Sequence, residues 1–92
     1  MSVEFDPAKN AANLAKHGVS LARAGDLDFQ TAFIRPDQRR DYGEPRWRAY
    51  GMIDDRMYML AFTMRAGVLR PISLRKANAK EARRYGGPEV EG

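Results

Sequence analysis

Arginine and lysine side chains, together with one histidine, carry the most evident chemistry in this sequence. Arg70, Arg75 and Lys76 lie within the seven residues "RPISLRK", and Lys16 directly precedes His17. Such groups could cleave a ribose phosphodiester without a metal: one helps the 2′-hydroxyl attack its own phosphate, one protonates the leaving oxygen, and cations stabilise the charged intermediate. The residue types alone do not assign these roles. The alternative is that the arginines are solvated strand ends and salt-bridge partners.

His17 has a simpler interpretation as a group at the end of a helix. It precedes Gly18, and a protonated histidine is favoured near a helix C-terminus, which tends to raise its pKa. The chain has no cysteine and no second histidine, and it has no glycine motif that would cradle a nucleotide phosphate. We therefore expect no metal site and no cofactor.

The charge balance favours an anionic partner. Sixteen Lys and Arg residues oppose twelve Asp and Glu residues, which gives a net charge of +4 and a pI near 9.8. An acidic protein surface would engage the same arginine forks as a phosphate, so the charge does not choose between RNA and protein. Without cysteine, signal peptide or membrane span, a soluble cytoplasmic protein with no membrane partner is expected.

Two short helices are expected at the N-terminal end. Asp6 can cap the first helix, Pro7 suits its first position, and Gly18 can end it. We expect a small apolar side on this helix and a solvent-exposed polar stripe formed by Lys9, Asn13 and Lys16. The second helix should begin at the N-cap Ser20 and present Leu21, Ala24 and Leu27 to the core.

The middle of the chain is typical of an antiparallel meander. Alternating, β-branched and aromatic residues predict strands at residues 29–36, 47–53, 57–65 and 68–75. The third of these is apolar on both faces, which predicts an interior strand. Pro71 implies that the last strand lies at an edge or that Pro71 occupies a position that pairs with nothing, and the order of the meander favours the edge. Strict alternation puts Arg70, Ile72 and Leu74 on one face and Ser73 and Arg75 on the other.

A capping box formed by Asn78 and Glu81 predicts a closing helix that stops at Gly86. The fold class is therefore α+β: two N-terminal helices packed on a three- or four-stranded antiparallel meander sheet, followed by a C-terminal helix. One domain spans residues 1–92, with a flexible tail at about 86–92. If the opening helices cover one face of the sheet, the face with Arg75 stays free for a ligand.

Four stretches of the chain resemble the BrnT family of toxins. They are "FDPAKNAANLAKHGVS", "YGEPRWRAYG", "FTMR" and "RPISLRKANAKEARRY". The likeness spans roughly residues 4–85, and its specific part is Lys-His-Gly followed later by Ile-Ser-x-Arg-Lys-Ala. The chain departs from the family at Pro71, where a β-branched residue is more usual, and this affects the strand edge locally.

The resemblance implies a RelE-like fold and a ribonuclease toxin of a type II toxin-antitoxin system. Such a toxin blocks translation by cutting RNA, and we expect it to act without a metal. Its expected partners are the RNA substrate and a BrnA-like antitoxin of ribbon-helix-helix type, which would mask the toxin in a hetero-oligomer. Operator DNA would be bound only through the antitoxin.

By position in the family's motifs, the resemblance implies a set of charged catalytic residues: Lys16, His17, Arg46, Arg65 and Arg75. A second set is expected to contact RNA: Lys9, Asn13, Arg70, Lys76 and Tyr85, the last because an aromatic ring can stack on an unpaired base. The alternative function is a non-catalytic basic interaction module, or an inactive co-repressor subunit, that only binds its antitoxin or nucleic acid.

Overall fold

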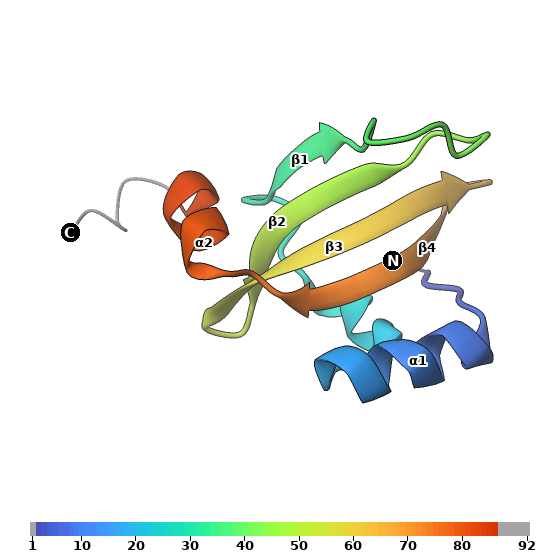
Figure 1. Ribbon diagram of the computed structural model, residues 1–92, viewed down its shortest axis with the longest axis horizontal. Helices are drawn as coiled ribbons and strands as arrows, with labels where there is room; N and C mark the ends of the chain where they lie inside the picture. The colour runs from blue at the N-terminus through green and yellow to red at the C-terminus, as the bar shows by residue number, and fades with distance from the viewer. Residues whose placement is uncertain (1, 87–92) are drawn as a thin grey trace.

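The computed structural model describes residues 2–86 and has the predicted α+β class (Figure 1). None of its helices within that range is long and apolar enough to cross a membrane. The flexible tail predicted for the C-terminus lies outside the described residues from residue 87 onward. The elements follow the chain as α1 (Pro7–His17), the 3-10 helix η1 (Leu21–Asp26), β1 (Phe33–Pro36), β2 (Trp47–Ile53), β3 (Arg56–Arg65), β4 (Val68–Lys76) and α2 (Ala79–Tyr85).

The sheet is an antiparallel meander with the strand order β1-β2-β3-β4. The predicted interior position of β3 is confirmed, since it pairs with β2 and β4 and is buried from Met59 to Thr63. Tight turns connect β2, β3 and β4, with left-handed backbone at Asp54 (φ 56°), Ala66 (φ 51°) and Gly67 (φ 77°). Pro71 lies in the edge strand β4, as its missing N–H requires.

Helix α1 and η1 cover one face of the sheet (Figure 1), which we call the core face. Ala49, Leu60 and Leu74 on this face are fully buried. The prediction of two N-terminal helices is confirmed only in part, because the second is a short 3-10 helix of six residues rather than an α-helix. Its Leu27 approaches β2 so closely that a Cβ at Gly51 would lie 2.7 Å from the Leu27 Cδ2 atom. Glycine is therefore required at residue 51 for η1 to pack.

Helix α1 begins and ends at its predicted caps. However, the helix turns a polar residue toward the sheet and an apolar residue toward solvent. Asp6 Oδ1 accepts a hydrogen bond from the Ala8 N–H, and Gly18 ends the helix with φ 74°. Leu14 is 50% exposed, whereas Asn13 is 6% exposed. The prediction that Asn13 belongs to a solvent-exposed stripe is therefore wrong, although Lys9 and Lys16 are exposed.

Side-chain amides explain this orientation of α1. Asn13 Oδ1 accepts from the Leu74 N–H at 3.1 Å, and its Nδ2 donates to the carbonyls of Leu74 and Val19 at 2.9 Å. Asn10 Oδ1 accepts from the Leu21 N–H at 2.7 Å. Unpaired backbone groups on the edge of β4 and at the start of η1 are thus satisfied by asparagines, which favours their burial over that of Leu14.

A β-bulge interrupts the pairing of β3 with β4. Ala61 pairs with Ser73, whereas Phe62 pairs with Pro71, so Ile72 has no partner of its own. One extra residue in β4 changes which side chains point to each face of the sheet. The alternation predicted for this strand holds only on the C-terminal side of the bulge.

The bulge brings Arg70 to the same face as Arg75. Arg70 pairs with Thr63, which alternates with Ala61 and shares its face. Ile72 packs in the cluster that contains Ala61, whereas Leu74 packs in the other cluster on the core face. The predictions that Arg70 lies opposite Arg75, and that Ile72 and Leu74 share a face, are wrong for this reason.

Candidate functional site

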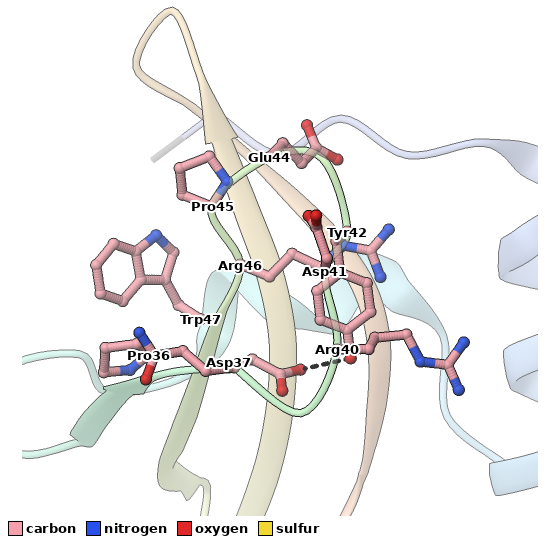
Figure 2. Close-up of a pocket in the computed structure, with 10 residues that line it drawn as sticks. Pro36, Asp37, Arg40, Asp41, Tyr42, Glu44, Pro45, Arg46 and Trp47 are labelled. Carbon is pink, nitrogen blue, oxygen red and sulfur yellow. Dashed lines mark hydrogen bonds between the residues drawn. The ribbon is translucent and has the colours of Figure 1, made fainter.

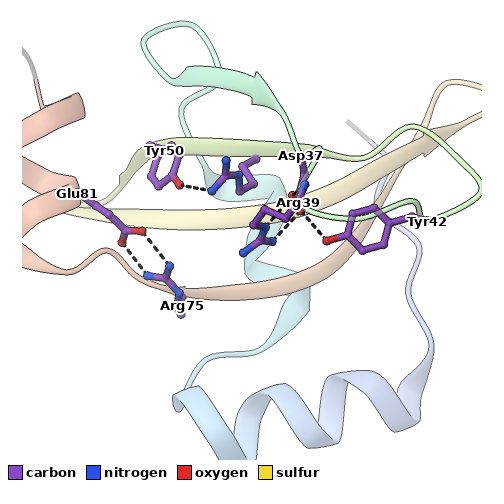
Figure 3. A network of polar contacts seen from close by, with 7 residues as sticks. Asp37, Arg39, Tyr42, Tyr50, Arg75 and Glu81 are labelled. Carbon is purple, nitrogen blue, oxygen red and sulfur yellow. Dashed lines mark hydrogen bonds and ion pairs between the residues drawn. The ribbon is translucent and has the colours of Figure 1, made fainter.

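The second face of the sheet carries arginines where the core face carries leucines. Arg48 and Tyr50 alternate with the buried Ala49 in β2, and they stand on the same face as Ala61 and Arg75 of the next two strands. We call this surface the basic face. Figure 3 shows it from the side, with α2 over one end and the loop of residues 37–46 near the other.

Arg75 is held by two parallel hydrogen bonds. Its Nη1 and Nη2 atoms donate to the Glu81 carboxylate at 2.8 and 2.9 Å (Figure 3), and Nη1 also donates to the Lys76 carbonyl. The Glu81 hydrogen bonds raise the pKa of Arg75, and those of Arg75 lower the pKa of Glu81. Glu81 also closes the predicted capping box with Asn78, which is confirmed. The start of α2 therefore fixes the Arg75 guanidinium.

One edge of Arg75 stays open in spite of this pair. Nη1 donates to Glu81 and to the Lys76 carbonyl, and Nη2 donates one of its two protons to Glu81. Within residues 2–86, Nε has no hydrogen-bond partner. The Arg75 side chain is 29% exposed. The Nε and Nη2 donors form the fork that binds a phosphate through two hydrogen bonds.

Lys16 and His17 occupy the last turn of α1, with Lys16 exposed and His17 half-buried. Partial burial lowers the pKa of His17, and the positive charges of Lys16 and Arg75 lower it further. The expectation that the helix terminus would raise this pKa is therefore wrong. Asn13, one turn before His17, bonds the backbone of Leu74, which directly precedes Arg75, so the last turn of α1 follows the edge strand that carries Arg75.

Four of the other predicted residues gather at the far end of β4. Arg46, Arg65 and Arg70 line a small pocket together with Lys9. At about 3.3 Å per strand residue, Arg70 and Arg75 are roughly 16 Å apart. The structure thus divides the predicted catalytic set into two groups, one at each end of the strand.

Acidic neighbours already engage two of the cations in this second group. Arg65 Nη2 donates to Glu44 at 3.0 Å, and Arg70 Nη1 donates to Glu4. Arg46 stacks its guanidinium over the Tyr42 ring at 4.0 Å, and its buried Nε has no hydrogen-bond partner in the described part of the chain. Arg75 is fixed by Glu81 and keeps an open donor edge, so it is better prepared than these three arginines to bind a phosphate.

The remaining predicted RNA contacts have different environments. Lys76 is exposed at the end of β4. Tyr85 of α2 stacks on Tyr50 at 4.1 Å between ring centroids, and its hydroxyl accepts from Arg35 Nη1 at 2.9 Å. Asn13 is buried with its amide fully engaged, so we leave it out of the candidate surface.

The loop of residues 37–46 is anchored by a buried aspartate that the sequence analysis did not identify. The Asp37 side chain is 2% exposed and accepts two hydrogen bonds of 2.7 Å from Arg39. The Tyr42 hydroxyl lies 3.4 Å from the same carboxylate (Figures 2 and 3). The Arg39 hydrogen bonds lower the pKa of Asp37 to about 2. Figure 2 shows the pocket that this loop encloses beside Trp47.

Replacing Asp37 with asparagine should lower the free energy of unfolding by about 1–2 kcal/mol at pH 7, because two charge-assisted bonds to a half-exposed arginine are lost. The folded-state pKa of about 2 lies below the ordinary 3.8. The carboxylate therefore stabilises the fold above pH 3.8, and this contribution disappears as the pH falls through 2. Urea unfolding from neutral to acidic pH measures the difference in free energy of unfolding between the wild type and Asp37→Asn. This difference should become smaller as the pH falls. The exposed Asp55→Asn variant should show almost no difference at any pH.

Arg35, Arg39 and Arg48 also belong to the basic face and were not among the predicted site residues. Arg48 lies directly opposite Arg35 in the β1–β2 pairing. The positive charge of Arg39 opposes the rise in the pKa of Arg75. The alternation of Arg48 with Trp47 and Ala49 was a usable signal, since the register of a meander puts it on the same face as Arg75. Within residues 2–86, no group of three or more His, Asp and Glu side chains could hold a metal ion.

Comparison with known protein families finds a match over most of the chain. A family model described as "Ribonuclease toxin, BrnT, of type II toxin-antitoxin system" matches residues 5–81. The match defines the class as a ribonuclease toxin of a type II toxin-antitoxin system, and such a system includes an antitoxin partner. The chain belongs to the BrnT family. No curated protein matches the chain.

Proposed function

We propose that this toxin is a metal-independent endoribonuclease that stops translation by cutting RNA. The proposed toxin consists of one domain with a RelE-like fold. The observation that carries the proposal is Arg75, which Glu81 fixes and which keeps a free donor edge. A preorganised guanidinium can stabilise the charge that develops on a phosphate without moving during the reaction.

In the proposed reaction, the scissile phosphate binds the Nε–Nη2 edge of Arg75. Neutral His17 accepts the proton of the 2′-hydroxyl, whose oxygen then bonds to phosphorus. The bond from phosphorus to the 5′-oxygen breaks, and this oxygen takes a proton from solvent or from the adjacent Lys16 ammonium. The products are a 2′,3′-cyclic phosphate and a 5′-hydroxyl, so atoms and charge balance without a cofactor.

The lowered pKa of His17 predicts the pH dependence of cleavage. Because burial, Lys16 and Arg75 hold this pKa below 6.5, His17 is neutral at pH 7 and ready to act as a base. The value of kcat/KM should rise with pH through the lowered pKa and then reach a plateau. A pH profile of His17→Gln should lose this acidic limb together with about 100-fold of the rate. A limb that persists unchanged in the variant would assign the titration to another group.

The test of the proposed function is cleavage of RNA by the purified protein in excess EDTA. Cleavage with a cyclic phosphate at the new 3′ end is expected, whereas intact RNA under these conditions would overturn the metal-independent mechanism. RNA that is bound but never cut, with or without added divalent metal, would support the non-catalytic basic module instead.

The proposed partner is a BrnA-like ribbon-helix-helix antitoxin, which forms a hetero-oligomer with the toxin and alone contacts operator DNA. The basic face supports this proposal, since partner carboxylates would compete with phosphate for Arg75. Expression of the toxin should arrest growth, and co-expression of the neighbouring antitoxin gene should restore it. Indifference of the cells to the toxin alone would contradict the proposal.

A further inference from the structure

A pocket of about 360 Å³ lies between α2 and strands β1 and β2, beside the Arg75 centre. Arg35 and Arg48 line it from the sheet, and Lys80 and Arg84 line it from the helix. The Tyr50 and Tyr85 rings and Glu81 complete the lining. Neither the family match nor the sequence motifs assign a function to these four cations.

Like charges lie close together in this pocket, both on the sheet and on the helix. Arg35 and Arg48 are directly opposite in the β1–β2 register, an arrangement that destabilises a sheet. Lys80 and Arg84 are four residues apart on α2, where like charges also repel. Two destabilising pairs at one place indicate a site that is completed by an anion.

The nearby carboxylates do not neutralise these cations, since other residues already engage them. Both oxygens of Glu81 accept from Arg75, and both oxygens of Asp37 accept from Arg39. Within residues 2–86, neither Arg35 nor Arg48 forms an ion pair. The pocket therefore keeps its positive charge in the folded protein.

Hydrogen bonds to tyrosine hold the two strand arginines in place. Arg35 Nη1 donates to the Tyr85 hydroxyl at 2.9 Å, and Arg48 Nη1 lies 3.4 Å from the Tyr50 hydroxyl. The two rings are stacked, so they fix both guanidinium groups relative to each other. Within residues 2–86, Arg48 Nε is buried and has no hydrogen-bond partner, an unsatisfied charge-bearing group of the kind that often belongs to a binding site.

From this geometry we propose that the pocket binds a backbone phosphate of the RNA strand next to the phosphate at Arg75. The inference rests on the proposed function for the identity of the ligand as RNA. Because Glu81 lines the pocket and also holds Arg75, the two sites adjoin on one surface. A single strand that crosses the basic face would place successive phosphates at the two sites and thereby orient the scissile bond.

The experiment measures binding separately from cleavage. A fluorescent 2′-O-methylated oligouridylate of about eight nucleotides lacks the attacking hydroxyl and is long enough for a small protein surface. Its affinity is measured by anisotropy from about 50 to 200 mM KCl for the wild type, Arg48→Gln and Arg84→Gln. The matched control is Arg56→Gln, which removes the same charge from an exposed residue paired with Ile53 of the core face.

Each pocket variant should weaken binding by about fivefold at 0.1 M salt and reduce the slope of log K against log salt by about 0.7, the value for one phosphate contact on a single strand. The control should keep the wild-type slope. Melting temperatures of the pocket variants should equal or exceed that of the wild type, because a repulsion is removed. A purely structural role for Arg48 would instead lower the melting temperature.

Pocket variants that bind the oligonucleotide with the affinity and slope of Arg56→Gln would overturn the inference. Variants that lose affinity only for the antitoxin would overturn it as well, since the pocket would then serve protein carboxylates. Failure of the proposed function is distinguishable: a protein that never cuts RNA but shows the predicted loss at Arg48 and Arg84 still has the phosphate site.

Discussion

Replacing Arg75 with alanine should lower the rate of RNA cleavage by about 100-fold or more, the usual cost of removing a preorganised donor from a charge-stabilising site. Arg75 is the predicted catalytic residue whose guanidinium is fixed at two atoms and open at another edge. Growth arrest should disappear with the activity. Single-turnover cleavage in excess EDTA measures the effect.

The loss in Arg75→Ala should not come from unfolding. The pair with Glu81 is partly exposed, and its removal should cost only about 1 kcal/mol of stability. Arg75→Lys keeps the charge but loses the planar fork, so it should recover little of the activity. Arg56→Ala, on the hairpin of β2 and β3, should cleave at the wild-type rate. Full cleavage by Arg75→Ala would remove this residue from the site.

Replacing Asn13 with alanine should lower the free energy of unfolding by about 2–4 kcal/mol, because three hydrogen bonds to buried backbone groups are lost together. For a chain of this length, the melting temperature should fall by roughly 10–20 °C. Thermal denaturation followed by circular dichroism measures both quantities. The amide bonds two atoms of Leu74 in β4, so no smaller side chain can replace it.

Asn13 also connects stability to the site. It fastens the middle of α1 to β4, and Lys16 and His17 follow one turn later. Cleavage should therefore fall in Asn13→Ala even at temperatures where the variant is folded, while oligonucleotide affinity should change little. Leu14→Ala, at the neighbouring exposed position, should leave both stability and cleavage almost unchanged. A selective loss of RNA affinity in Asn13→Ala would restore the direct RNA contact expected from the sequence.

Local signals in the sequence were sufficient for most of the element bounds. Asp6, Pro7 and Gly18 delimit α1, and the capping box of Asn78 and Glu81 begins α2. These features depend on hydrogen bonds between residues a few positions apart, which a sequence displays directly. The edge position of β4 also followed from one residue, Pro71, because a missing N–H excludes an interior strand.

The errors arose where contacts between distant elements override a local pattern. The polar stripe predicted on α1 included Asn13, but the backbone of β4, sixty-one residues further along the chain, requires the amide of this residue. The bulge at Ile72 depends on how β3 and β4 pair and changed the face of Arg70. The Arg75–Glu81 ion pair could not be predicted for the same reason. The capping box indicates that Glu81 bonds Asn78 at the start of its helix, but it does not indicate that Glu81 also binds Arg75.

The face of the sheet that meets RNA is the central claim, and a nuclear magnetic resonance titration tests it most directly. The labelled protein is titrated with the 2′-O-methylated oligouridylate, and the backbone amides and arginine Nε–H groups are followed. The largest shifts are expected at Arg48, Tyr50 and Arg75 on the basic face. Shifts confined to η1 and to Arg56, with Arg48 and Arg75 unchanged, would contradict it.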